Sequence, residues 1–493
     1  MGKESINIVW FKRDLRLRDH APLVNASNEQ APTLLLYLFE PMLIESNHYG
    51  DRHWRFVYES LVEMQQELQD YNLKLHIACQ DASELFRDLN RIYKIKCVFS
   101  HEETGIDLTF KRDKKLKKWF REEGIRWIES PTNAVQRGLM HRKNWRSNWQ
   151  EIIDQPAEDP GLGLIQGVAE SAKLKDILQS SRITKRFKQP NPNFQQGGEA
   201  AAWNTLNDFM FARAKNYNNN ISAPGPARYG CSRLSPHLTW GNLSIRQVYR
   251  FSKEYYTDSG SKRDLRSFQS RLRWHCHFIQ KFESEPRMEF ENLNRGYNDL
   301  RGKVEREKVQ AWKMGTTGFP MIDACMRSVK QTGYLNFRMR AMLVSFLTHH
   351  LWQPWQTGAR FLGRQFLDFE PGIHYSQFQM QAGTMGVNTI RIYNPVKQSK
   401  DHDPDGLFIK EWVPELKDVP AELIHEPWQL SSMEQEMYDC RLGKDYPKPI
   451  IDDIKKSYKR ASEQLWNKKK EQEVKQENKR ILNKHVKKRR KTS

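Results

Sequence analysis

A short apolar run that passes directly into alternating charges constrains the fold of this chain more than any other feature. Residues 6–11 are mostly apolar and include β-branched side chains, a pattern typical of a buried strand. Strands buried on both faces occur in parallel sheets, which bind ligands at the carboxyl ends of their strands. Arg13, Asp14, Arg16 and Asp19 follow at that end. The pattern predicts either a ligand-binding edge or a solvated loop with surface ion pairs.

The alternation of strands and helices continues to about residue 130. Four more segments have the short apolar pattern of strands, namely 33–39, 73–78, 96–100 and 125–128. Residues 54–70 and 109–123 between them have the spacing of amphipathic helices. Strands that alternate with helices favour a doubly wound parallel sheet, so we expect an α/β domain over residues 1–132.

The rest of the chain changes character twice. Residues 133–203 mix charged residues with Pro- and Gly-containing segments, which predicts an interdomain connector with a short helix near 172–179. Apolar residues at positions i, i+3 and i+4 recur between 204 and 467, which predicts a larger all-α domain there. Residues 468–493 have few apolar side chains, so we expect a basic tail that is a solvated helix or disordered.

The net charge of +20 favours polyanionic partners, nucleic acid above all. The tail holds twelve Lys and Arg against three Glu, which gives +9 and leaves +11 on residues 1–467. The six cysteines have no C-x-x-C spacing, so we expect free thiols in a reducing cytoplasm and no metal site. No stretch has the length and apolarity of a membrane helix, and the first residues do not resemble a signal peptide.

A run of small, hydroxyl-bearing and basic residues precedes a predicted helix. The run consists of Cys231, Ser232, Arg233, Leu234 and Ser235. Backbone N–H groups and hydroxyls at a helix start can bind phosphate, and an Arg adds charge. The alternative is an ordinary helix start in which Ser235 is the cap and Pro236 occupies the first turn.

Four segments in a fixed order point to one protein family. Residues 7–20 read NIVWFKRDLRLRDH, 312–327 read WKMGTTGFPMIDACMR, 391–395 read RIYNP and 446–452 read YPKPIID. These segments resemble the motifs of the photolyase and cryptochrome family, with a Lys for the first Arg and a His for the final Asn of the opening motif. The resemblance runs from residue 6 to about residue 465. It implies an α/β domain followed by a helical domain that binds flavin adenine dinucleotide (FAD).

The resemblance also implies which residues bind FAD. The run 231–235 matches the loop around the FAD diphosphate, with Cys231 in place of a Thr. Tyr217 matches a Tyr that lies along the phosphates. These matches favour the phosphate-binding interpretation of the run over the ordinary helix start.

The same resemblance implies a second group of residues at the flavin ring. Arg340 matches an Arg that pairs with an Asp at the position of Asp368. A buried flavin needs such a fixed cation, and the carboxylate holds the cation in place; the alternative is two unrelated surface charges. Glu370 is a near match for a second Asp, and His374 stands where an Asn faces flavin N5.

The electron-relay tryptophans of the family are mostly replaced in this chain. Trp355 matches one relay position, whereas Phe378 stands at the flavin-proximal position and Gly302 at the outermost one. Phenylalanine is harder to oxidise than tryptophan, so we expect flavin photoreduction to be slow or rerouted. The candidates for a substitute relay are Trp352, Tyr375 and Tyr393.

The residues that would bind a DNA lesion also depart from the family. Trp274 keeps the aromatic platform on which a flipped-out base can stack, although a Trp is also a common core residue. Arg271 replaces the Glu that hydrogen-bonds a pyrimidine dimer, and it can donate to pyrimidine carbonyls instead. Asn336 and Phe337 stand in place of the His pair associated with repair of (6-4) photoproducts.

The sequence leaves three candidate functions. The first is blue-light repair, in which reduced FAD passes an electron to a cyclobutane pyrimidine dimer in single- or double-stranded UV-damaged DNA. Its proposed catalytic residues are Trp274, Arg271, His374 and Trp355. The second is a cryptochrome photoreceptor without repair activity. The third, a flavin oxidoreductase that works in the dark, lacks a G-x-G-x-x-G sequence after a strand.

The antenna chromophore of the family, a folate or a deazaflavin, is left undetermined by the sequence. Glu102 and Glu103 follow the predicted strand 96–100, near the place where the family binds this second chromophore. We expect the protein to be a monomer.

Overall fold

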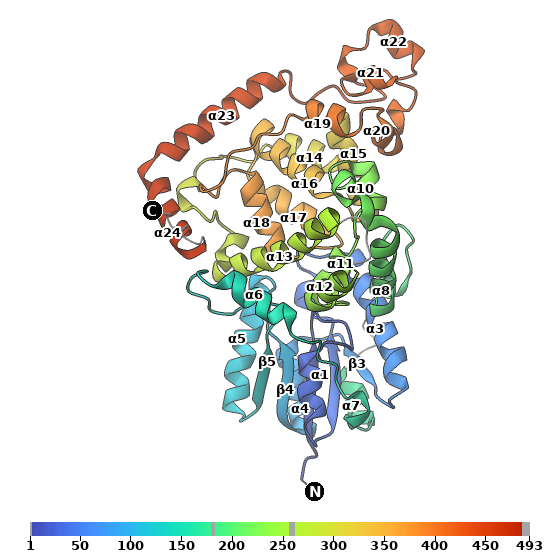
Figure 1. Cartoon of the computed structure of the whole chain (residues 1–493), viewed down its shortest axis with the longest axis vertical. Coiled ribbons are helices and arrows are strands. Elements are labelled where there is room, and N and C mark those ends of the chain that lie inside the picture. The colour runs from blue at the N-terminus through green and yellow to red at the C-terminus, as the bar shows by residue number, and fades with distance from the viewer. Residues whose placement is uncertain (1, 179–182, 256–261, 486–493) are drawn as a thin grey trace.

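The computed structural model describes residues 2–178, 183–255 and 262–485, which form a sheet-based part and a helical part (Figure 1). The sheet is entirely parallel and has the strand order β3-β2-β1-β4-β5. Its strands are β1 (Ser5–Phe11), β2 (Thr33–Leu38), β3 (Leu75–Ala78), β4 (Lys94–His101) and β5 (Arg126–Ser130). All five overlap the segments that the sequence pattern predicts.

Helices cover both faces of this sheet, as Figure 1 shows around the blue strands. They are α1 (Ala21–Ser27), α2 (Pro41–Ile44), α3 (Asp51–Gln69), α4 (Ala82–Ile92) and α5 (Asp107–Glu122). β2 is buried along its whole length, and β1 is buried except at its first residue. This double burial explains why both strands read as continuous apolar runs, and it confirms the predicted α/β class.

The predicted connector is a packed segment. It contains α6 (Trp145–Asp154) and α7 (Ala172–Leu178). Trp149 is 1% exposed and belongs to an apolar cluster of the helical part. Gly167 forms a bridge with Thr33 at the start of β2. The connector therefore packs against both parts of the molecule.

The described residues beyond 198 are largely helical. The first α-helices of this part are α8 (Glu199–Asp208), α9 (Tyr217–Asn220), α10 (Pro224–Gly230), α11 (Ser235–Trp240), α12 (Ile245–Glu254), α13 (Lys262–Ser284), α14 (Arg306–Met314), α15 (Pro320–Thr332), α16 (Phe337–Ser345), α17 (Trp355–Gln365) and α18 (Pro371–Gln381). The remaining ones are α19 (Pro395–His402), α20 (Leu407–Trp412), α21 (Ala421–Ile424), α22 (Ser432–Met437), α23 (Ile454–Lys470) and α24 (Gln472–His485). Within the described chain, no helix combines the length and apolarity required to cross a bilayer.

The charged stretch after β1 lies at the junction of the two parts. Asp14 is 3% exposed and Arg16 7% exposed, so the interpretation as a solvated loop is wrong. Arg16 Nη1 donates to the carbonyl of Gly241 at 3.1 Å. Gly241 has a φ of +73°, and a Cβ at this position would collide with the backbone of Arg13. The stretch thus docks the sheet edge onto the helical part.

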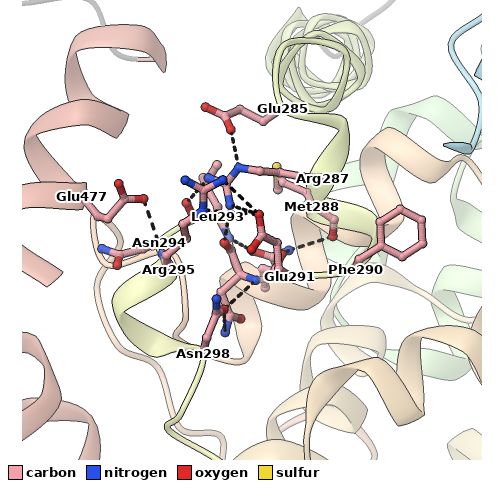
Figure 2. Close-up of polar contacts among 12 residues, drawn as sticks. Glu285, Arg287, Met288, Phe290, Glu291, Leu293, Asn294, Arg295, Asn298 and Glu477 are labelled. Carbon is pink, nitrogen blue, oxygen red and sulfur yellow. Dashed lines mark hydrogen bonds and ion pairs between the residues drawn. The ribbon is translucent and has the colours of Figure 1, made fainter. Parts of the chain in front are cut away.

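The predicted tail is docked rather than solvated over residues 472–485. Val474 and Ile481 of α24 are both fully buried. The loop after α13 holds the helix with polar contacts: Arg295 donates its backbone N–H to Glu477 at 3.5 Å (Figure 2), and Glu285 forms an ion pair with Arg480. The expectation of a solvated or disordered tail is wrong here, because a few apolar residues and several ion pairs suffice to anchor a short helix. Residues 486–493 lie outside the described residues.

Candidate functional site

A cavity of about 1040 Å³ lies among the helices of the helical part. Its wall is formed by the 231–235 run, one side of α13, the start of α16, one side of α18 and the 387–393 loop. The predicted site residues that line it are Tyr217, Cys231, Ser232, Arg233, Leu234, Ser235, Arg271, Trp274, Arg340 and Asp368. The fold therefore gathers most of the predicted site around one space.

The 231–235 run joins α10 to α11 and is held in an unusual conformation. Arg213 donates to the carbonyl of Cys231, which fixes the start of the run. Arg233 has a φ of +62°, a conformation that is unfavourable for a residue with a Cβ and that often marks functional sites. Its guanidinium lies over the Tyr334 ring, 3.5 Å from the centroid. Ser235 does not cap α11; its hydroxyl hydrogen-bonds Asp368.

Arg340 and Asp368 form a bidentate ion pair in the cavity wall. Arg340 Nη1 and Nη2 each lie 3.0 Å from an Asp368 carboxylate oxygen. Arg340 Nε donates to the carbonyl of Leu335 at 2.7 Å, which fixes the plane of the guanidinium. Burial alone would raise the pKa of Asp368, but the charge and hydrogen bonds of Arg340 outweigh it and lower the pKa below its ordinary value. The wall therefore carries a permanent, oriented cation.

Several buried polar atoms in the cavity wall have no hydrogen-bond partner among the described residues. They are Nη1 of Arg233, both ring nitrogens of His275 and of His485, Oδ1 of Asn336, Nε of Arg338 and Oε1 of Gln377. An unpaired buried polar group costs about 1–3 kcal/mol, and native proteins pair nearly all of them. A ligand with both donors and acceptors would pair these atoms. The set, together with apolar residues of the same wall such as Leu238 and Phe268, fits a nucleotide with heteroaromatic rings.

Part of the cavity wall is aromatic and exposed to solvent, and it adjoins a basic surface. Trp274 and Phe337 are each 46% exposed, so Trp274 is not a core residue. The Arg271 guanidinium lies 4.9 Å from the centroid of the Trp274 ring. Arg271 and Trp274 also line a second, open hollow of about 620 Å³. The other residues of this hollow are Lys262, Arg263, Arg266, Ser267 and Ser270, all from the first turns of α13.

Two family models match the parts of the chain that carry this architecture. The DNA photolyase model matches residues 7–141, which contain the sheet, and the model of the FAD binding domain of DNA photolyase matches residues 268–467. The chain belongs to the photolyase/cryptochrome family. Its helical part contains the FAD-binding domain, and the cavity described above has the polar and apolar groups that this cofactor requires.

Relatives in this family include proteins named as photolyases and as cryptochromes. Deoxyribodipyrimidine photo-lyase of Alkalihalophilus pseudofirmus is 27% identical over 480 residues, which cover 94% of this chain and 98% of that protein. Cryptochrome DASH of Gloeobacter violaceus is 27% identical over 500 residues, which cover 93% of this chain and 95% of that protein. The crystal structure of a bacterial class III photolyase from Agrobacterium tumefaciens has a TM-score of 0.79 and 26% identity, and covers 96% of this chain and 99% of that one. Photolyase and cryptochrome functions both remain compatible with these relatives.

Two residues that the family pattern assigns to FAD do not line the cavity. Glu370 accepts a hydrogen bond from Arg13 Nη1 at 3.0 Å and so joins the sheet edge to the helical part. His374 Nε2 lies 2.8 Å from the carbonyl oxygen of Ala359, and burial lowers the pKa of His374 to about 3. Neither residue lines the cavity, so the placement of Glu370 and His374 at the cofactor stays a prediction.

The helical phase of α18 explains why His374 does not line the cavity. Its residues Ile373, Gln377 and Met380 line the cavity at i, i+4 and i+7. His374 and Phe378 lie on the neighbouring row and pack against each other, with ring centroids 4.6 Å apart. The photolyase motif gives the spacing of these residues in the sequence, but which of them face the cavity depends on how α18 packs against its neighbouring helices.

The relay residue Trp355 is also remote from the cavity wall. Its Nε1–H donates to Asn292 Oδ1 at 2.8 Å, and its ring lies 6.2 Å from that of Tyr375. Neither of these two residues lines the cavity, whereas Tyr393, another candidate for the relay, does. Trp355 therefore does not line the cavity, and its assignment as the second residue of an electron relay stays a prediction.

Residues that the sequence analysis missed complete the wall. α24 contributes Leu482 and His485, and α13 contributes His275 and Lys281. The α13 residues share a helical face with Trp274 and could have been found by extending that face through its next turn. The α24 residues had no comparable signal, because the surrounding composition resembles that of a solvated tail.

One buried histidine and aspartate cluster has the composition of a metal site. Asp14 Oδ2 lies 3.0 Å from His20 Nε2 and 2.6 Å from His101 Nδ1. His20 Nδ1 accepts the backbone N–H of Leu23 at 3.2 Å, so the ring proton is on Nε2 and is donated to Asp14. A metal would need a lone pair on that nitrogen. The hydrogen bonds account for the cluster, which stabilises the turn between β1 and α1.

The carboxyl edge of the sheet is filled by buried ion pairs. Arg112 pairs with Glu40, with Glu103 at 2.8 Å and with Asp113 at 2.8 Å, and Lys12 pairs with Asp113 at 2.8 Å. The cavity that remains between the sheet edge and the helical part measures about 20 Å³, enough for a water molecule. The edge where doubly wound sheets bind ligands is thus occupied by this chain's own side chains.

Proposed function

We propose that this protein repairs UV-damaged DNA in blue light by passing an electron from reduced FAD to a cyclobutane pyrimidine dimer. The observation that carries this proposal is an aromatic, solvent-exposed part of the cavity wall: Trp274 and Phe337 line the cavity, and Trp274 also lines the hollow at the basic start of α13. A flipped-out base can stack on an aromatic side chain, while Lys and Arg neutralise the flanking phosphates. An aromatic cavity beside a basic surface suits a damaged nucleotide within a longer strand.

The residues of the cavity wall would have different roles. FAD, when bound, would supply the excited electron that splits the carbon–carbon bonds of the dimer, and it would receive that electron back. Trp274 would stack on the dimer, and Arg271 would donate N–H groups to a pyrimidine carbonyl in place of the family's Glu. Arg340, oriented by Asp368, would stabilise negative charge in the cavity.

The second candidate function is a cryptochrome-type photoreceptor without repair activity. One observation favours it over repair: Arg271 replaces the dimer-binding Glu of the family. A photoreceptor requires the flavin and a route for its reduction but no preference for damaged DNA. Repair requires such a preference.

A repair assay distinguishes the two functions. The purified protein, with its flavin fully reduced, is exposed to blue light with an oligonucleotide that contains one cyclobutane dimer, and the repaired product is separated by chromatography. We expect light-dependent repair that stops in the dark and is lost in Trp274→Ala. Trp466→Ala is the matched control, because Trp466 is 50% exposed and lies on α23, outside the cavity wall. A flavin-loaded wild type that repairs nothing would refute repair and favour the photoreceptor.

A further inference from the structure

His275 differs from the other histidines of α13 and α18 in its surroundings. It lies one residue after Trp274 on α13, and both of its ring nitrogens are shielded from solvent without a hydrogen-bond partner among the described residues. His277, two residues on, is bonded through Nδ1 to Arg142 at 3.0 Å. His374 is bonded to the Ala359 carbonyl. Among these three, His275 alone has both nitrogens available to a ligand.

His275 lies where the large cavity meets the small one at the sheet edge. It lines both spaces, as does Leu238 from α11. The two charged groups that act on its ring electrostatically are Arg13, from the sheet edge, and Asp368, from the ion pair in the cavity wall. The imidazole is therefore close to the ion pair of Arg340 with Asp368.

The charge state of His275 suits a hydrogen-bonding role. Burial, with a smaller effect of Arg13, lowers the pKa of His275 to about 4. The ring is therefore neutral near pH 7, with one N–H donor and one lone-pair acceptor. The edge of a flavin ring presents carbonyl and imine acceptors next to an N–H donor, so it can pair with either nitrogen.

We propose that His275, and not His374, is the histidine that hydrogen-bonds the flavin ring of bound FAD. The family pattern assigns a flavin-facing side chain to position 374, but α18 directs this position towards Phe378 and Ala359. The neighbouring helix α13 supplies an unpaired imidazole that lines the cavity. This proposal rests on the binding of FAD alone, and it holds whether the protein repairs DNA or senses light.

The test compares His275→Leu, His275→Gln and His374→Gln with the wild type. FAD affinity is measured on the apoprotein by flavin fluorescence, and thermal unfolding of the apoprotein is measured separately. We expect His275→Leu to weaken FAD binding by about tenfold or more, because a buried flavin group loses its partner. The same variant should leave the melting temperature of the apoprotein unchanged or higher, since it removes two unpaired nitrogens. His275→Gln, which keeps a donor and an acceptor, should recover most of the affinity.

His374→Gln is the matched control and should bind FAD like the wild type, because its side chain lies outside the cavity wall. The visible absorption band of bound flavin should shift in His275→Leu and not in His374→Gln. Equal FAD affinity of His275→Leu and wild type would overturn the proposal, as would a loss of affinity that accompanies a lower melting temperature of the apoprotein. A wild type that binds no FAD would instead refute the cofactor assignment itself.

Discussion

Replacement of Arg340 by Ala tests the ion pair in the cavity wall through its dependence on pH. The Asp368 side chain is 8% exposed, and both of its oxygens accept hydrogen bonds from Arg340. Removing one partner of a buried pair leaves an uncompensated charge, which costs roughly 3–5 kcal/mol of folding free energy. We therefore expect Arg340→Ala to lower the stability of the apoprotein by about this amount at pH 7 and to abolish FAD binding.

The sign of the pH dependence follows from the pKa of Asp368. In the wild type this pKa is lower than in the unfolded chain, so the carboxylate contributes stability above about pH 4 that is lost as the pH falls through the folded-state pKa. In Arg340→Ala the opposite holds, because burial without the cation raises the pKa of Asp368 and folding then favours the protonated acid. The stability deficit of the variant should therefore shrink as the pH falls from 7 towards 4.

Urea denaturation of the apoproteins at a series of pH values measures this deficit. Asp368→Asn in the Arg340→Ala background should recover part of the lost stability at pH 7, since it removes the unpaired charge. Arg441→Ala is the control for an Arg–Asp pair at the surface, with the Arg441 side chain 48% exposed, and should leave the free energy of unfolding close to that of the wild type. A deficit that is the same at pH 7 and pH 4.5, or the absence of any deficit, would refute a buried charge pair.

Three further predictions concern other parts of the molecule. Glu285→Gln should loosen α24, because Glu285 pairs with Arg480 and lies near Lys484 and His485. Trypsin should then cleave within α24 faster than in the wild type. Equal cleavage rates would contradict this role of Glu285. Arg263→Gln should reduce the slope of log K against log salt for DNA binding by roughly 0.9 if Arg263 contacts one phosphate, and an unchanged slope would place the DNA elsewhere. Tyr393→Phe should slow flavin photoreduction, whereas Phe378→Trp should not accelerate it, because Tyr393 lines the cavity and Phe378 does not. Transient absorption measures the rate of photoreduction in both variants. Acceleration by Phe378→Trp would show that position 378 reaches the flavin.

Strands that are buried on both faces of the sheet were the easiest elements to predict, because nearly all of their residues are apolar. β1 and β2 are covered by helices on both faces, so their apolar runs mark them clearly. The Arg340–Asp368 pair was also found from motif spacing, because few positions in the family pattern combine these two charges. Such features depend on residue type and order, both of which a single sequence contains.

The direction in which each side chain points was harder to predict than the set of residues that belongs to the site. Gln377 lines the cavity and His374 does not, because the way α18 packs against its neighbouring helices sets which of its faces meets the cavity. The charges of residues 12–20 looked like surface charges because their partners, such as Glu370, lie far away in the sequence. The docking of α24 was missed because its polar partners, in the loop after α13, precede it by nearly 200 positions.

The docking of α24 has a consequence for the order in which the site is assembled during protein synthesis. The ribosome makes α13 and the loop after it long before α24, and domains generally begin to fold as they emerge. A nascent chain can therefore form the sheet and the ion pair of Arg340 with Asp368 while the wall that contains Leu482 and His485 is still missing. Chains that stop before residue 472 would contain the FAD-binding motifs and still have an incomplete cavity. The wall of the cavity can therefore be completed only after α24 has been made.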